Sequence, residues 1–136
     1  MKAERAAKLQ KGDAFKTKDG RIHRVERVYA YKQGNGKQGT AVVDTSGTHY
    51  AAAYITSAKP SHIRILAESG AENIEGYSLI NNYGYTFTIK GKKCDARYWA
   101  NCYGAALNVW QVDGDIAKTK RRLIENKLNE YERWCE

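Results

Sequence analysis

The sequence lacks any apolar run of about 18 residues, the length that a membrane-spanning helix requires. Its opening stretch, MKAERAAKLQ, carries charged side chains where a secretory signal peptide would have an apolar segment. We therefore expect a protein of the cytoplasm that has no contact with a membrane.

Cysteine and histidine are both scarce, with three residues of each. No C-x-x-C spacing is present, so neither a disulfide framework nor a zinc knuckle is expected. His23, His49 and His62 share no spacing, and the H-E-x-x-H, nucleophile, Walker and Rossmann patterns are all absent. We expect no metal and no cofactor, and we identify no catalytic residue. A binding protein is favoured, and an enzyme without a linear motif stays possible.

The composition is that of a globular chain. Hydrophobic residues make up 42% of its 136 residues, and ten tyrosines, three tryptophans and two phenylalanines supply the aromatic rings. This length suits a single domain. An acidic, turn-rich segment at residues 67–76 is a possible joint between two subdomains.

Short pieces rich in β-branched and aromatic residues fill the first half of the chain between turn residues. They follow a short helix of two to three turns that begins near Ala3, and they predict a curled antiparallel sheet or a small barrel. Apolar residues three apart, at Ile22, Val25 and Val28, require a bulge near Glu26 or Arg27. The predicted strands are AFKTK, RIHRVERVYAY, TAVVD, THYAAAYIT and SHIRIL.

The second half predicts a β-hairpin followed by two helices, which gives an α+β fold. The hairpin joins YSLIN to YTFTIK around Asn82-Tyr83-Gly84. An αα-hairpin would follow, with Asp95 as the first N-cap and Asp113-Gly114-Asp115 between the helices. All three tryptophans would belong to its core. The first helix has apolar residues at helical spacing: Ala96, Trp99, Ala100, Tyr103, Ala106, Leu107 and Trp110.

The excess of positive charge is confined to the first half. Residues 1–66 hold 13 Lys and Arg against five Asp and Glu, whereas residues 67–136 hold ten of each. Segregated charge of one sign indicates a surface that faces a polyanion. A solvated face that binds nothing would also explain it.

Basic and aromatic residues alternate within this positive half, which is the pattern expected for DNA or RNA binding. Arg21, Arg24, Arg27 and Lys32 are the candidate phosphate contacts. Tyr29 and Tyr31 are the candidate surfaces on which unpaired bases stack. Tyrosine is also common at sheet edges and protein interfaces, so the pattern has a second interpretation.

A second basic cluster falls in the first turns of the last predicted helix, where the helix dipole disfavours cations. It indicates an anionic partner unless Asp113 and Asp115 neutralise it. A different class of function also fits the sequence: a protein-binding module or inhibitor that uses its aromatic-rich second half, with self-association included. The cluster consists of Lys118, Lys120, Arg121 and Arg122.

Overall fold

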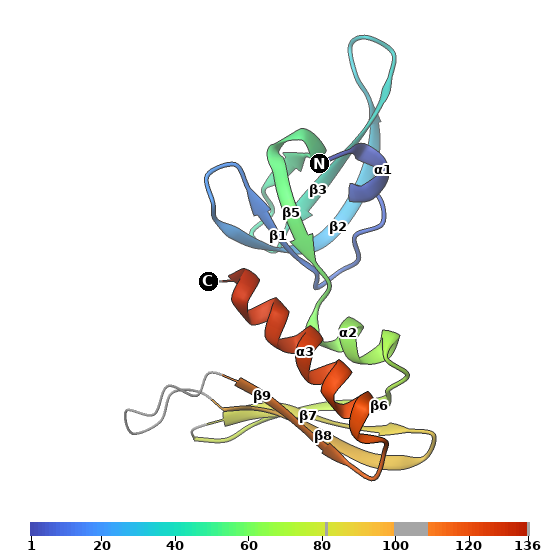
Figure 1. Ribbon diagram of the computed structural model, residues 1–136. Coiled ribbons are helices and arrows are strands. Elements are labelled where there is room, and N and C mark those ends of the chain that lie inside the picture. Colours follow the sequence, from blue (N-terminus) through green and yellow to red (C-terminus); the bar gives the residue numbers. More distant parts are fainter. Residues whose placement is uncertain (81, 100–108, 136) are drawn as a thin grey trace. The chain divides into compact units, whose positions relative to one another are not determined.

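The structure is a computed structural model that describes residues 1–80, 82–99 and 109–135 (Figure 1). The chain divides into two compact units, residues 1–61 and residues 62–136. Each unit contains one antiparallel sheet, of five strands in the first and four in the second. The α+β class predicted from the sequence is therefore confirmed.

The first unit is an open sheet in the order β4-β3-β2-β1-β5. The predicted barrel is wrong, because β4 and β5 form the two edges and do not pair. The piece THYAAAYIT is not one strand: Ala52, Ala53 and Tyr54 form the one-turn η1, which leaves short strands on either side. The elements are α1 (Ala3–Ala6), β1 (Ala14–Thr17), β2 (Ile22–Lys32), β3 (Gln38–Asp44), β4 (His49–Ala51), η1 (Ala52–Tyr54) and β5 (Ile55–Lys59).

A bulge in β2 decides which of its side chains face the core. The pairing with β3 shifts between Val25 and Arg27, as the apolar spacing predicted. Val25 and Val28 both pack on the core, although they are three residues apart. Beyond the bulge the strand alternates normally, so Arg27, Tyr29 and Tyr31 share the opposite face. The core of this unit consists of Ala6, Phe15, Val25, Val42, Ala52 and Ile55.

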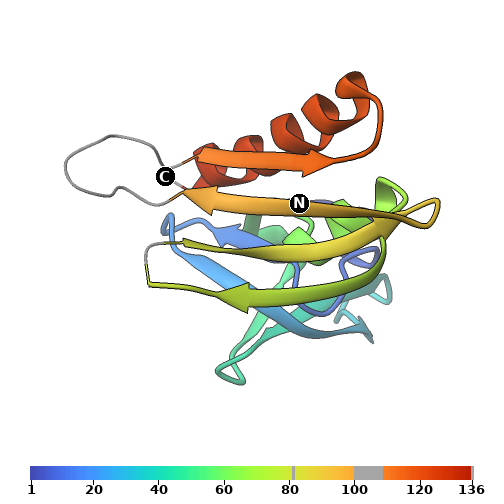
Figure 2. The same cartoon turned by 90° about the horizontal axis from the view of Figure 1, so that it is seen from below.

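The second unit is a sheet in the order β6-β7-β8-β9, with the long α3 along one face (Figures 1 and 2). Trp110, Ile124 and Leu128 are fully buried where α3 meets this sheet. On α3, Glu125 and Asn129 accept hydrogen bonds of 2.8 Å from the backbone amides of Val112 and Trp110 on the edge strand β9. The elements are α2 (His62–Glu68), β6 (Glu72–Ser78), β7 (Asn82–Ile89), β8 (Lys92–Trp99), β9 (Val109–Gly114) and α3 (Lys118–Cys135).

The predicted αα-hairpin is wrong, because α3 is the only helix after the sheet among the described residues. Asp95 lies inside β8 opposite Asp113 of β9, and caps no helix. Trp99 and Trp110 belong to strands, where burial alternates every second residue in place of the helical period. The middle of the predicted helix, residues 100–108, lies outside the described residues.

Two smaller predictions also need correction. The piece SHIRIL forms α2 with Ile65 and Leu66 buried, so packing overrides the strand preference of its isoleucines. The predicted hairpin does form between β6 and β7, but Asn82, Tyr83 and Gly84 begin β7 instead of making the turn. At the N-terminus, α1 is a single turn that ends at Ala6.

Candidate nucleic-acid interface

Two tyrosine rings lie side by side on the face of the first sheet that points away from its core. Tyr29 and Tyr31 are two residues apart on β2, and their ring centroids are 6.3 Å apart. Their partners across the ladder on β3 are Ala41 and Gly39. A Cβ atom on Gly39 would lie 2.7 Å from Cζ of Tyr31, so the ring covers the glycine. Small residues beneath the rings allow both tyrosines to lie against the sheet while staying partly exposed.

Arg27 and His49 complete this group. The Tyr29 hydroxyl shares a hydrogen bond of 2.8 Å with His49 Nδ1 on β4. The guanidinium carbon of Arg27 lies 5.2 Å from the centre of the Tyr29 ring, within cation–π distance. We call Arg27, Tyr29, Tyr31 and His49 the tyrosine platform. A shallow hollow of about 300 Å³ runs along its tyrosines and histidine.

The other cations predicted for this interface lie elsewhere in the first unit. Arg21 is in the turn before β2, with Nε 3.8 Å from the Asp19 carboxylate. Arg24 donates a hydrogen bond of 3.4 Å to the Gly12 carbonyl. Strand alternation puts Lys32 on the opposite face from Tyr31. Of the six residues predicted, the structure therefore brings together Arg27, Tyr29 and Tyr31.

His49 is the platform residue that the sequence did not reveal as part of this group. Its position depends on the hairpin between β3 and β4, which pairs Val43 with His49. Ser46 and Gly47, which lie between the predicted strands TAVVD and THYAAAYIT, form the turn of that hairpin. The pairing of β3 with β2 was needed as well, and no local pattern gives that pairing.

An acid, an imidazole and a hydroxyl are linked on the inner side of the same sheet. Asp44 Oδ2 lies 3.2 Å from His23 Nδ1, and His23 Nε2 lies 3.2 Å from Thr17 Oγ1. The connectivity is that of a nucleophilic triad. However, Thr17 is only 1% exposed and its hydroxyl donates to Asp19. This cluster therefore ties β1, β2 and β3 together and offers no accessible nucleophile.

The pKa of Asp44 reflects this environment. Burial raises it, but hydrogen bonds from Ser46 and from the backbone amide of Thr48, with the charge of His23 nearby, outweigh burial. The net effect is a pKa below the ordinary value for aspartate. Asp44 is consequently a carboxylate whose charged form stabilises the fold.

The second basic cluster lies in the first turns of α3, as predicted, within the second unit. Lys120 lines a cleft of about 520 Å³ together with Lys90, from the turn between β7 and β8, and Lys92, the first residue of β8. Asp115 lines the same cleft, and its carboxylate lies 3.5 Å from Lys92 Nζ. Asp115 thus offsets part of the positive charge, whereas Asp113 lies in β9.

The described parts of the chain contain no group of three or more His, Cys, Asp or Glu side chains that could hold a metal ion. No helix within residues 1–80, 82–99 and 109–135 is long and apolar enough to cross a membrane. The chain matches no protein-family model, no curated protein and no solved structure.

Proposed function

We propose that the first unit binds single-stranded nucleic acid on the tyrosine platform. In this proposal Tyr29 and Tyr31 stack on unpaired bases, and Arg27 contacts the phosphate backbone. The observation that carries the proposal is the pair of partly exposed rings held side by side above Gly39 and Ala41.

The geometry of the rings favours a single strand over a duplex. Neighbouring bases along one strand of a duplex are about 3.4 Å apart and cover each other's faces. The two rings are 6.3 Å apart, so bases can stack on both only when they are unpaired and spread. Every base has a π face, so this contact would tolerate many sequences.

The charge of the unit supports the same partner. Residues 1–61 hold 12 Lys and Arg against five Asp and Glu, a net charge of +7. Such an excess attracts phosphates from any direction and supplies affinity that does not depend on sequence. The shallow hollow at the platform suits an extended polymer better than an enclosed small molecule.

Fluorescence anisotropy with the full chain tests the proposal. The probes are fluorescein-labelled oligo(dT) and oligo(rU) of about 15 nucleotides, within the range that one small domain covers. We expect binding to a single strand that weakens steeply as salt rises. The double substitution Tyr29→Ala and Tyr31→Ala should weaken it by about 30-fold or more, because stacking contributes roughly 1 to 3 kcal/mol per base.

Matched substitutions separate the platform from general effects. Tyr54 is 41% exposed and is not among the residues that line the hollow of the platform, so Tyr54→Ala should weaken binding far less than the double substitution does. Lys8→Glu changes the net charge as much as Arg27→Glu does, and Arg27→Glu should weaken binding more. Absence of binding at low salt, or equal losses for platform and control variants, would refute the proposal.

A further inference from the structure

The proposed function leaves unexplained the face of the second sheet that lies opposite α3. Within residues 62–136, no described helix or strand covers it (Figures 1 and 2). Strand pairing arranges its side chains in rows that cross the sheet. The first row is Glu75, Thr86, Asp95 and Asp113, the second is Tyr77, Gly84, Arg97 and Gln111, and the third is Asn82, Trp99 and Val109.

Tyr77 is fixed against this face by its neighbours. A Cβ atom on Gly84 would lie 2.8 Å from the Tyr77 hydroxyl, so the tyrosine covers the glycine. That hydroxyl donates a hydrogen bond of 2.8 Å to Asp95 and accepts one of 3.1 Å from Arg97 Nε. The ring is thereby held in one orientation although it remains partly exposed.

Arg97 and Trp99 continue this ordered arrangement. The Arg97 guanidinium carbon lies 6.0 Å from the centre of the Tyr77 ring and 5.4 Å from that of the Trp99 ring. Trp99 Nε1 donates a hydrogen bond of 3.1 Å to Gln111. Tyrosine, arginine and tryptophan are the residues that most often dominate binding at protein interfaces. Because these three are already ordered, little side-chain freedom would be lost on binding.

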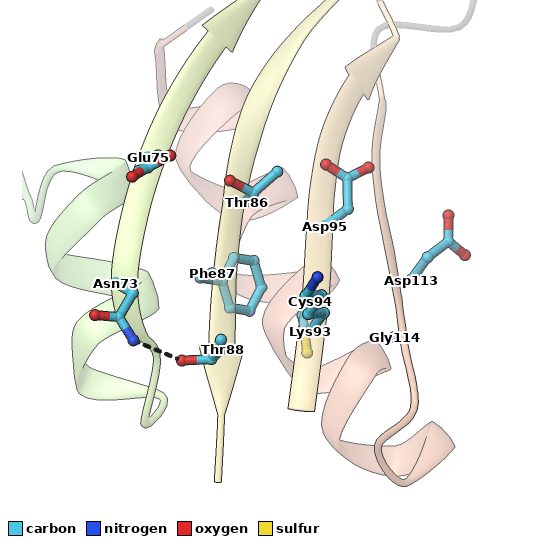
Figure 3. Close-up of a pocket in the computed structure, with 10 residues that line it drawn as sticks. All are labelled: Asn73, Glu75, Thr86, Phe87, Thr88, Lys93, Cys94, Asp95, Asp113 and Gly114. Carbon is cyan, nitrogen blue, oxygen red and sulfur yellow. Dashed lines mark hydrogen bonds between the residues drawn. The ribbon is translucent and has the colours of Figure 1, made fainter. Parts of the chain in front are cut away.

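The neighbouring row of the same face is acidic (Figure 3). Glu75, Asp95 and Asp113 line a hollow of about 600 Å³, and Lys93 is the one cation among the described residues of its lining. Asp95 faces Asp113 directly across the ladder, and like charges in that relation destabilise a sheet. Asp95 is paired with Tyr77 and Arg97. The side chains of Glu75 and Asp113, in contrast, make no hydrogen bond or ion pair within the described residues, although the Asp113 charge also acts on Arg97.

We propose that this face docks a protein segment that carries Lys or Arg side chains. Its cations would pair with Glu75 and Asp113, and its apolar groups would pack on Trp99 and Val109. Charge complementarity selects this occupant, since a nucleic acid would meet repulsion from the acidic row. The proposal uses only the second unit and is independent of the tyrosine platform.

Peptide binding to the full chain tests this surface. The probes are a labelled short peptide of alternating lysine and valine and its counterpart with glutamate in place of lysine. We expect the lysine peptide to bind at least about tenfold more tightly. The double substitution Glu75→Lys and Asp113→Lys should abolish that preference, and Trp99→Ala should weaken binding of the lysine peptide.

Two controls make the outcome specific. The double variant Glu4→Lys and Glu130→Lys has the same net charge as the double-lysine variant of the acidic row, and it should keep the preference. The Tyr29→Ala and Tyr31→Ala variant should also keep it, which separates this proposal from the nucleic-acid proposal. Equal binding of both peptides, or no binding, would overturn the inference. So would displacement of the peptide by oligo(dT), or a dimer in sedimentation that dissociates on Trp99→Ala.

Discussion

Gly39→Ala is the substitution that most sharply links the backbone of the first sheet to the proposed binding. The added methyl group would lie 2.7 Å from Cζ of Tyr31 and 2.9 Å from Nε2 of the Gln33 side chain. Both atoms are at the ends of side chains, so the Tyr31 ring can swing away while β3 stays in place. We therefore expect a folded protein with a disrupted platform.

The magnitudes follow from these contacts. Alanine is more favourable than glycine within a strand by roughly 0.5 to 1 kcal/mol, which offsets the lost packing of Tyr31. The free energy of unfolding should change by less than about 1 kcal/mol. Loss of one stacked base should weaken oligonucleotide binding by about 5-fold to about 150-fold.

Urea unfolding and fluorescence anisotropy measure these two quantities on the same samples. Gly34→Ala is the matched control, because it adds the same methyl group in the same hairpin where nothing lies within 4 Å. It should change neither quantity appreciably. The reasoning is refuted if Gly39→Ala binds like the wild type while Tyr31→Ala does not, or if Gly39→Ala unfolds the sheet.

Three further predictions concern stability. Gly84→Ala should destabilise the second unit by about 3 kcal/mol, because its Cβ would meet the backbone oxygen of Ala96, which cannot move aside; urea unfolding checks this. By the same assay, Trp110→Ala should lower the free energy of unfolding by about 3 to 5 kcal/mol, since Trp110 is fully buried. Trp99→Ala should lower it by about 1 kcal/mol or less, since Trp99 is partly exposed. Folding lowers the pKa of Asp44, so its carboxylate stabilises the fold near neutral pH and this stabilisation is lost as the pH falls below about 4. When the free energy of unfolding is measured against pH, Asp44→Asn should therefore lose less stability in acid than the wild type does.

The strands of the first unit could be predicted where local pattern and tertiary packing agree. The spacing of Val25 and Val28 required a bulge, and the bulge is present because both valines pack on one core. That bulge also puts Arg27 and Tyr29 on the face opposite Val25. Closure of the sheet could not be predicted, because it depends on whether the distant strands β4 and β5 meet.

The second unit shows why a helical period can mislead. Trp99 and Trp110 fall at helical spacing in the sequence, yet one is partly exposed in β8 and the other is buried in β9. Their agreement with a helical stripe is fortuitous, because they belong to different strands. The rows that place Tyr77 beside Arg97 arise from strand register, which the local sequence does not determine.

Backbone amide chemical-shift mapping by NMR with oligo(dT) added to the full chain tests the central claim most directly. The account predicts that the largest shifts fall on the platform strands, at Arg27 to Tyr31, at Gly39 to Ala41 and around His49. It further predicts that these shifts disappear in the Tyr29→Ala and Tyr31→Ala variant. Shifts confined to residues 62–136, or no shifts at low salt, would contradict it.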